Sequence, residues 1–435
     1  MTKRKLLKTI TLTLSLFLLA PIANKVQATE DSQPTIVAEA GIIMDYDTGE
    51  IIYEKNANDK KYIASTTKLM TAILFAEHNS KNDILTYTKN AKSQPPYTLQ
   101  SHMQELSGKT LNIGDKLSAD IAMKSLLIYS ANDVAYMISD EVAGSTESFA
   151  KMMNDKAAEL GLTSTHFENP NGLASTVTNQ DVNYSTAYEL ALIMKEAYQH
   201  EWIKDTVSLS STYIDLPQNV RIELIQRNTE LGSNGNLGGK TGFTNMAGNC
   251  FAGVYERNGK KYLTVVLKST NVSDASHSKI RFEDIDKMMD YSENASRKVY
   301  KSSGEEVGTT ELEYKAFGFF GPKKTISAPI VLSEDVQLYD NNINNNETII
   351  NIDSKETSAW KAASSDKVPL TVNVKQFSTT VNGKIDISTF TLIKANILLY
   401  VAIIVLIGII AALVIFIIRM INSRKRRRSS YRRRY

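Results

Sequence analysis

The sequence predicts a mixed α/β (α+β) fold: an antiparallel sheet packed against helices with an all-helical subdomain, then a small β-rich domain and one C-terminal transmembrane helix. Three observations predict it. Two groups of β-prone runs enclose a block with helical periodicity, Thr/Val/Ile-rich runs recur over residues 300–392, and residues 397–418 carry no charge. The elements follow the order expected when one sheet packs against helices: a hairpin, helices, antiparallel strands and a closing helix.

Residues 1–28 are expected to be a secretory signal peptide. They have a basic start, an apolar run over 10–22 and the small-residue cleavage site Val26-Gln27-Ala28. An uncleaved N-terminal anchor is the alternative, and under either reading the bulk of the chain is exported.

Charge is distributed unevenly along the chain. Residues 1–28 carry five Lys/Arg and residues 397–435 carry nine, with no acid in either segment, so the formal charge of +3 leaves −11 for residues 29–396. An acidic working region argues against nucleic-acid binding. Cys250 is the only cysteine, which excludes an intrachain disulfide, and its apolar run over 250–254 predicts a buried structural thiol.

Residues 29–299 are predicted to form one folded domain, which holds the chemical motifs described below. The runs 42–46 and 51–54 flank a turn and predict a hairpin. Helical spacing follows in three segments, with Gly161 as a helix stop and Thr186 to Glu189 as a capping box. These segments lie near 119–143, 147–160 and 185–199.

Three more β-like runs, 237–244, 250–256 and 262–269, precede a closing helix marked by apolar residues between Ile280 and Met289. Asn258-Gly259 between the last two runs is the strongest short hairpin signal.

The C-terminal third is predicted to hold a β-rich domain, an anchor and a tail. The runs 326–332, 348–352 and 368–374, separated by polar breaks such as 341–346, indicate a small β domain at 300–392 that acts as a spacer or platform. Residues 397–418 would span about 33 Å as a helix, enough for a bilayer core. The basic tail, 419–435, is then expected in the cytoplasm, with the catalytic domain outside.

Ser65 and Lys68 are the first chemical motif. They lie three residues apart before an uninterrupted apolar run, which predicts a nucleophile and its base one turn apart on a buried helix. The alternative is an N-capping serine with a surface lysine.

Two further motifs follow: Ser130-Ala131-Asn132 between two helical stretches, and Lys240-Thr241-Gly242 on a strand. Each triplet alone is common. Their order after Ser65 and Lys68, on these kinds of element, is hard to obtain by chance.

With these motifs, the chain resembles the low-molecular-mass penicillin-binding proteins, the D-alanyl-D-alanine carboxypeptidases of serine peptidase family S11. The stretches 64–71 and 165–173 are also similar, and the resemblance covers about residues 35–300. It implies a DD-peptidase/β-lactamase-like fold without metal or cofactor. The implied partners are peptidoglycan stem peptides ending in D-Ala-D-Ala, and β-lactam antibiotics. The anchor and the likeness together favour a Gram-positive envelope.

The resemblance also implies the catalytic roles. Ser65 attacks the carbonyl of the D-Ala-D-Ala bond, Lys68 acts as general base and Ser130 relays a proton to the departing D-alanine. Asn132 holds a backbone amide of the substrate.

The implied binding residues lie on the Lys-Thr-Gly strand and on the closing helix. Lys240 and Thr241 attract the terminal carboxylate, and Phe243, after Gly242, shares the oxyanion hole with the Ser65 N–H. Arg281 is expected to contact the same carboxylate. A second arginine, at position 227, is expected to be a solvated surface residue.

Several alternatives stay open. A transpeptidase uses the same acyl-enzyme with an amine acceptor, and a membrane-tethered adhesin with a decayed fold is the non-enzyme alternative. A β-lactamase is disfavoured because Glu168 lacks the Glu-x-x-Leu-Asn context and Ala131 replaces the Asp of Ser-Asp-Asn. A metallohydrolase is disfavoured because the five histidines form no ligand-spaced pair, and His166 is expected to be structural.

Overall fold

The computed structural model describes residues 33–431, except 96, 175–181, 353–357 and 366. The expected signal peptide, 1–28, lies outside the described residues. The predicted division of the chain at 29–299 and 300–392 stays a prediction.

A five-stranded antiparallel sheet is the centre of the catalytic region, in the order β2-β1-β11-β10-β9. Its strands are β1 (Ala40–Asp45), β2 (Ile51–Lys55), β9 (Asn236–Thr244), β10 (Gly248–Arg257) and β11 (Lys260–Leu267). Both predicted hairpins are confirmed. Asn258 and Gly259 have φ of +52° and +73°, the positive values that a two-residue hairpin turn requires.

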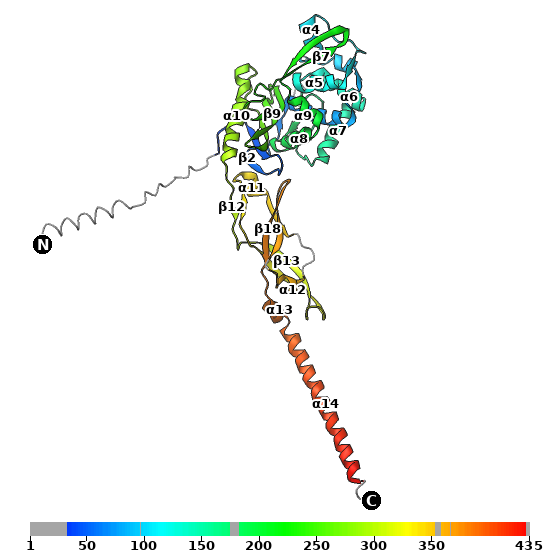
Figure 1. Ribbon diagram of the computed structural model, residues 1–435, viewed down its shortest axis with the longest axis vertical. Helices are drawn as coiled ribbons and strands as arrows, with labels where there is room; N and C mark the ends of the chain where they lie inside the picture. The colour runs from blue at the N-terminus through cyan, green and yellow to red at the C-terminus, as the bar shows by residue number, and fades with distance from the viewer. Residues whose placement is uncertain (1–32, 96, 175–181, 353–357, 366, 432–435) are drawn as a thin grey trace, which may run out of the picture. The chain divides into compact units, whose positions relative to one another are not determined.

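Helices cover both faces of this sheet (Figure 1). Ile42 and Met44 of β1 pack in one core cluster with α8 (Ala187–Gln199), whereas Ile43 packs in a second cluster with α10 (Ala275–Asn294). Alternate residues of a strand point to opposite faces, so this division places α8 and α10 on opposite sides. All six residues of β1 are buried as a result.

The helices of this region other than α8 and α10 are α2 (Lys68–His78), α3 (Lys89–Lys92), α4 (Leu99–Ser107), α5 (Ala119–Lys124), α6 (Asn132–Ala143), α7 (Thr146–Glu159) and α9 (Glu201–Val207), with one π-helical turn, η2 (Ser125–Tyr129), between α5 and α6. The predicted helical segments 119–143, 147–160 and 185–199 are confirmed as α5 to α8, whereas α3, α4 and α9 were not predicted. Gly161, with φ +73°, follows the end of α7 as predicted.

The predicted capping box at Thr186 is half right. The Thr186 hydroxyl accepts from the Glu189 N–H at 3.1 Å, so the N-cap is confirmed. The Glu189 carboxylate instead accepts from the Ser164 N–H and the Thr165 hydroxyl. Two donors from residues 164–165 therefore take the place of the return bond that a capping box needs.

Three small two-stranded sheets, of which only β7–β8 is a hairpin, complete the region before residue 300 and had no counterpart in the sequence predictions. They are β3 (Lys61–Tyr62) with β6 (Tyr184–Ser185), β4 (Ile84–Thr86) with β5 (Lys116–Ser118), and β7 (Ser211–Leu216) with β8 (Val220–Ile225).

A second five-stranded antiparallel sheet follows, in the order β13-β14-β18-β17-β16. Its strands are β13 (Glu306–Lys315), β14 (Lys323–Leu332), β16 (Thr348–Ile352), β17 (Val368–Val374) and β18 (Phe377–Ile385). A separate pair is formed by β12 (Lys298–Lys301) and β15 (Val336–Leu338). Two short helices, α12 (Ala359–Ala362) and α13 (Thr389–Ala395), complete this part of the chain. The three predicted β runs fall within β14, β16 and β17.

The polar segment 341–346 is not the irregular break that the sequence predicts. It forms the helix α11 (Asn342–Glu347), capped by the Asn341 side chain. The side-chain amides of Asn341 and Asn344 are buried and both donate to the carbonyl of Ile51 at 3.0 Å. The asparagines therefore cap a helix and bind an edge strand, which the polar composition alone does not distinguish from a loop.

The predicted span is part of a longer helix, α14 (Ile397–Tyr431), which continues into the basic tail. Its apolar side chains are exposed, and by length and composition the helix can cross a membrane.

Candidate active site

Ser65 lies in a single 3₁₀ turn, η1 (Ala64–Thr67), that leads directly into α2. The Thr66 hydroxyl holds this turn by donating to the Ile63 carbonyl at 2.6 Å. Ala64 has φ +46°, a conformation that residues with a side chain rarely adopt and that is found most often at functional sites. The predicted helix start is thus confirmed in a tighter form, with Lys68 as the first residue of α2.

Lys68 is fully buried and connects three parts of the site. Its Nζ donates to Ser65 Oγ at 3.0 Å, to Asn132 Oδ1 at 2.9 Å and to the carbonyl of Asn171 at 3.1 Å. Burial, reinforced by the positive charge of Arg227, lowers the pKa of Lys68 to about 7. A lysine with this pKa is neutral for a large fraction of the time at neutral pH and can accept the serine proton.

The segment 169–173 supports the catalytic turn from outside the helix. The Thr71 hydroxyl donates to the Pro170 carbonyl at 2.6 Å, and the Asn171 carbonyl accepts from Lys68. Gly172 has φ +79°, and a Cβ atom there would lie 1.9 Å from the Ala64 carbonyl oxygen. This position therefore requires glycine, because no side chain fits between the segment and the Ser65 turn.

Ser130 ends the π-helical turn in a left-handed conformation, with φ +74° and ψ +35°, and is buried. A π turn beside a strained residue is common at functional sites. Asn132 begins α6, its N–H donates to the Tyr97 carbonyl and its side-chain oxygen accepts from Lys68. The predicted interhelical loop is confirmed and lies beside the Ser65 turn.

The buried carboxylate of Asp133 holds this loop in place. It accepts from the N–H groups of Leu99 and Gln100 and from the Tyr87 hydroxyl, at 2.8–3.1 Å. Burial raises the pKa of Asp133.

The Lys-Thr-Gly motif and the residue after it lie on β9, which is an edge strand of the sheet. These residues are Lys240, Thr241, Gly242 and Phe243. A Cβ atom on Gly242 would lie 3.1 Å from the Ser65 nitrogen, so the glycine allows β9 to approach the Ser65 turn closely. An edge strand leaves backbone groups available for pairing with an extended peptide.

Arg281 reaches this strand from α10. Its guanidinium donates to the carbonyls of Gly242 and Cys250 at 3.2 and 3.0 Å. Burial lowers the pKa of Arg281 to about 10. The arginine thus fixes the backbone of the Lys-Thr-Gly strand, whereas the predicted contact with a substrate carboxylate stays a prediction. Cys250, beside it, is buried as expected.

Arg227 lies beside the Ser130 loop, a contact that the sequence does not predict. It is exposed as expected, but it is not a remote surface residue. Its Nε donates to the Tyr129 carbonyl at 2.9 Å, and its guanidinium lies over the rings of Tyr97 and Tyr129. No motif surrounds it in the sequence, and only the fold brings β8 next to the Ser130 loop.

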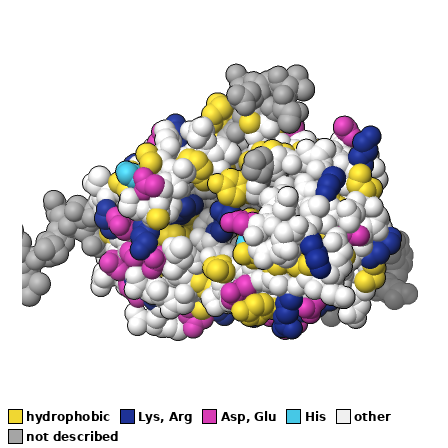
Figure 2. Space-filling model, turned by 90° about the horizontal axis from the view of Figure 1, so that it is seen from above, with side chains coloured by type: hydrophobic (Ala, Val, Ile, Leu, Met, Phe, Trp, Pro, Cys, Tyr) yellow, Lys and Arg dark blue, Asp and Glu magenta, His cyan; other side chains and the backbone are white. Residues whose placement is uncertain are grey.

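The site therefore gathers positive charge. Burial sets the pKa of Lys240 well below its usual range, and the nearby cations Lys68, Arg227 and Arg281 act in the same direction. Figure 2 shows a hollow near the centre of the face seen from above, with Lys and Arg side chains at its edge. An anionic ligand would relieve this repulsion, so the arrangement suits a substrate with a carboxylate.

A separate cluster brings together potential metal ligands from three positions. Glu77, Glu196 and His200 place ligand atoms within 4.8 Å of one another, although the sequence spacing of the histidines gives no sign of it. Glu77 is paired with Lys156 at 2.7 Å, and a bound lysine competes with a cation for that carboxylate. The ring of His166 lies 5.5 Å from that of Tyr184 at a tilt of 33°, and its Nε2 lies 3.6 Å from Glu168 Oε1.

Comparison with known proteins assigns the family. A model of the D-alanyl-D-alanine carboxypeptidases of peptidase family S11 matches residues 27–271, more than half of the chain. The chain belongs to this family. The match contains every site residue described above except Arg281.

Three relatives are 29–32% identical to the chain over the residues that align. The D-alanyl-D-alanine carboxypeptidase DacF of Bacillus subtilis is 29% identical over 292 residues, covering 66% of this chain and 70% of DacF. DacC of Escherichia coli is 32% identical over 284 residues, covering 63% of this chain and 65% of DacC. A D-alanyl-D-alanine endopeptidase of Escherichia coli is 30% identical, with 80% of its length covered.

Solved structures give the same fold. Penicillin-binding protein D2 of Listeria monocytogenes in its ampicillin-bound form has a TM-score of 0.50 at 28% identity, covering 60% of this chain and 99% of that one. A serine-to-alanine mutant of the Streptomyces K15 DD-transpeptidase has a TM-score of 0.51 at 25% identity, covering 60% and 100%. The similarity therefore lies in the catalytic region.

Proposed function

We propose that this chain is a serine-type D-Ala-D-Ala carboxypeptidase that removes the terminal D-alanine from peptidoglycan stem pentapeptides. The observation that carries the proposal is the contact of 3.0 Å between Lys68 Nζ and Ser65 Oγ, in a setting that lowers the pKa of Lys68 to about 7. A serine hydroxyl is a weak nucleophile until a base takes its proton, and this lysine is positioned and tuned to do so.

The acylation half-reaction follows from the placement of the groups. Neutral Lys68 takes the proton of Ser65, whose oxygen attacks the carbonyl carbon of the penultimate D-alanine. The N–H groups of Ser65 and Phe243 stabilise the oxyanion, and losing one such donor typically costs about 10²–10³ in rate. As the C–N bond breaks, the proton that Lys68 took passes through Ser130 to the amine of the departing D-alanine. Water then attacks the carbonyl carbon of the acyl-enzyme, gives up a proton to neutral Lys68, and this proton returns to Ser65 as the ester bond breaks.

Substrate binding uses the edge of β9 and the positive charge of the site. Lys240 and Thr241 bind the terminal carboxylate, and this negative charge favours the protonated form of Lys240. Arg281 holds the Gly242 carbonyl and thereby the position of the strand. Asn132, fixed by Lys68, binds a backbone amide of the stem peptide.

A DD-transpeptidase is the second candidate function, because the Streptomyces K15 structure of the same fold is described as one. Transpeptidation needs an amine of a second peptide in place of water. The E. coli endopeptidase shows a third reaction within the same relatives.

A β-lactamase is disfavoured by the position of Glu168. Its carboxylate is exposed and lies 3.6 Å from His166 Nε2. A slow acyl-enzyme with penicillins is therefore expected. The ampicillin-bound Listeria relative supports β-lactams as ligands.

The proposed setting is the cell membrane. The helix α14 anchors the chain by a single span with its basic end in the cytoplasm, and the catalytic region lies outside. The second sheet acts as a spacer.

The decisive experiment is labelling with a fluorescent penicillin, followed by an assay of D-alanine release from a pentapeptide. Wild type is expected to be labelled and to release free D-alanine, and Ser65→Ala to do neither. An unlabelled wild type would remove the mechanism. D-alanine is released when Ser65 is acylated in either reaction, so the acyl product distinguishes them: free tetrapeptide is expected from a carboxypeptidase, and cross-linked dimers in place of free tetrapeptide would establish the transpeptidase instead.

A further inference from the structure

The loop at the tip of the β13–β14 hairpin exposes large aromatic side chains to solvent. It has the sequence Ala316-Phe317-Gly318-Phe319-Phe320-Gly321-Pro322. Phe319 is 83% exposed and Phe320 52% exposed. Leaving such a side chain in water forgoes about 1.5–3 kcal/mol of burial energy. Grouped exposed aromatics at a loop tip therefore mark an interaction surface.

This loop is bound to the first turn of α14. The Tyr400 hydroxyl donates to the Ala316 carbonyl, and the rings of Phe317 and Tyr400 lie 5.2 Å apart. One turn earlier, the Asn396 amide donates to the Tyr314 hydroxyl at 3.1 Å. The hairpin tip and the start of the helix are thus joined by side-chain contacts on two successive turns.

These contacts fix the level of the loop along the helix axis. The uncharged segment of α14 begins at Ile397, and Tyr400 lies three residues further, about 4.5 Å along the axis. A helix that crosses a bilayer with this segment places Tyr400 at the outer boundary of the hydrocarbon layer, where tyrosine is enriched. The loop that Tyr400 binds lies at the same level.

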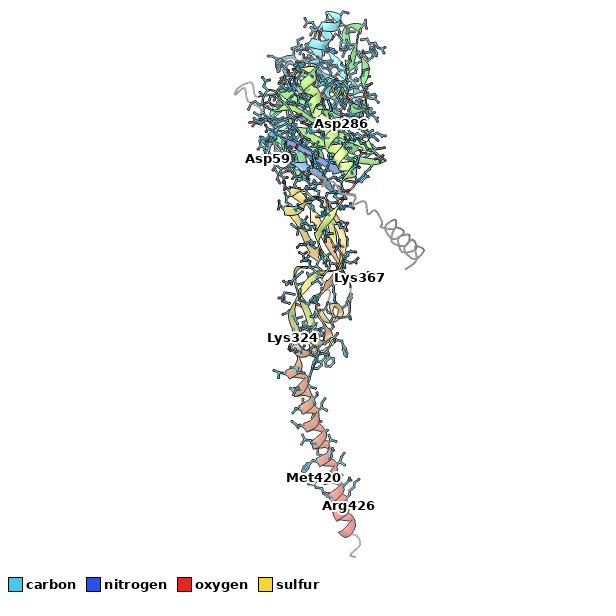
Figure 3. The ribbon with its side chains drawn as sticks, turned by 90° about the vertical axis from the view of Figure 1, so that its left-hand side faces the viewer. Asp59, Asp286, Lys324, Lys367, Met420 and Arg426 are labelled. Atoms are coloured by element: carbon cyan, nitrogen blue, oxygen red, sulfur yellow. The ribbon has the colours of Figure 1, made fainter. Side chains whose placement is uncertain are left out.

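The residues around the loop have the charge that suits lipid headgroups. Lys315, Lys323 and Lys324 flank it, and no acid occurs between Glu313 and Glu334. Lys323 is paired with Glu313 only at 3.8 Å, with both side chains about three-quarters exposed. Lys324, labelled in Figure 3, lies on β14 directly after the loop. Basic residues at an anionic membrane surface contribute about 1 kcal/mol each.

We propose that residues 316–322 form a second membrane contact, which inserts Phe319 and Phe320 into the outer boundary of the bilayer while the flanking lysines meet anionic headgroups. This proposal rests on the proposed span of α14. Phe390 of α13, the helix that precedes α14, is also 72% exposed. The span and the loop together hold the second sheet at the membrane surface.

The test uses the full chain in vesicles of phosphatidylcholine and phosphatidylglycerol, with an environment-sensitive fluorophore on one introduced cysteine. Cys250 is completely buried, so labelling is directed to the new thiol. Phe319→Cys reports on the loop and Phe320→Cys repeats the measurement. Leu406→Cys, in the middle of the span, reports on insertion of α14, and Ile349→Cys on β16, 59% exposed, is the matched exposed control.

The expected result is that lipid-borne quenchers quench the probes at 319, 320 and 406, whereas aqueous iodide quenches the probe at 349. If iodide quenches the probes at 319 and 320 while the probe at 406 is quenched only by lipid-borne quenchers, the loop contact is overturned and the span is kept. Iodide access at 406 would overturn the span and the loop contact together. A probe at 319 shielded from both quenchers would show that protein, such as a second copy of the chain, covers the loop, and would also overturn the proposal.

Discussion

At Lys68, burial and a neighbouring cation act in the same direction. Burial disfavours the charged ammonium, and Arg227 repels it, so that the pKa falls to about 7, while Asp133 partly opposes the change. The lysine is protonated below this pH and cannot act as a base. Its neutral fraction increases as the pH rises through 7, which gives the direction of the pH dependence.

We therefore expect the rate of acylation by a fluorescent penicillin to rise between pH 6 and pH 8 and to level off above. Below the midpoint the rate should fall about tenfold per pH unit, because only neutral Lys68 reacts. Stopped-time labelling across this range measures the profile. A flat profile from pH 5.5 to 8.5 would contradict the role of Lys68 as base.

Arg227→Gln provides a second test of the same electrostatics. Removing the positive charge removes a repulsion that lowers the pKa of Lys68, so the midpoint of the acylation profile should move to higher pH. The exposed Arg221→Gln, which lies near Asp215 on the β7–β8 pair, is the matched control and should leave the midpoint in place. A midpoint unchanged by Arg227→Gln would mean that this arginine does not tune the base.

Gly172 allows a sharp test of packing. Gly172→Ala would place a Cβ 1.9 Å from the Ala64 carbonyl oxygen, and the Ser65 turn would have to move. Overpacking costs typically about 1–3 kcal/mol, and the positive φ adds about 1–2 kcal/mol. We expect a lower melting temperature and at least tenfold slower penicillin labelling.

Gly161→Ala is the control for that variant. Gly161 has a similar φ of +73°, but no atom lies within 4 Å of the position that a Cβ would take there, so only the backbone strain applies. Its melting temperature should fall slightly and its labelling rate should stay unchanged. Equal labelling rates in the two variants would show that the 169–173 segment does not position Ser65.

At the scale of elements, α11 binds the edge of the catalytic sheet through two buried asparagines. Asn344→Ala removes two buried hydrogen bonds, to the Ile51 and Tyr339 carbonyls, and each lost bond costs about 0.5–1.5 kcal/mol; both carbonyls still accept from Asn341. We expect a lower melting temperature with unchanged penicillin labelling at 25 °C. The exposed Asn345→Ala, which loses one bond to Asp340, is the control and should melt close to wild type. An unchanged melting temperature in Asn344→Ala would contradict the docking role of α11.

The elements that carry the motifs could be predicted because each has a local signal. The spacing of Ser65 and Lys68, the apolar run after them and the Asn258-Gly259 turn are all visible in short windows. The supporting residues could not be predicted in this way. Asn171 contributes a backbone carbonyl, which any residue type has, and Arg227 reaches the site only through tertiary folding.

Other differences have the same physical origin. Within the segment 119–143 the interhelical loop at Ser130 was predicted, whereas the π turn before it and the left-handed conformation of Ser130 were not. Glu189 leaves its expected cap for donors from a distant loop. Local sequence patterns thus predicted where these helices and strands lie. Hydrogen bonds between residues far apart in the sequence account for the places where the observed structure differs.

At the scale of the molecule, the anchor is separable from the chemistry. Deleting residues 397–435 should transfer the protein from the carbonate-washed membrane fraction to the soluble fraction. D-alanine release from a soluble pentapeptide should stay roughly within twofold of the full chain, since no described site residue lies beyond Arg281. Retention of the truncated chain in membranes would indicate another anchor, and loss of D-alanine release would indicate a catalytic role for the C-terminal segment.

The positively charged residues of the site should also attract anions other than the substrate. These residues are Lys68, Lys240, Arg227 and Arg281. A field that attracts one carboxylate attracts other small anions as well, and it weakens as salt shortens the screening length, which is about 10 Å at 0.1 M. Phosphate and polyanionic wall polymers should therefore compete with stem peptides for the same space. The ionic composition next to the membrane would then set how much of the enzyme is open to its substrate.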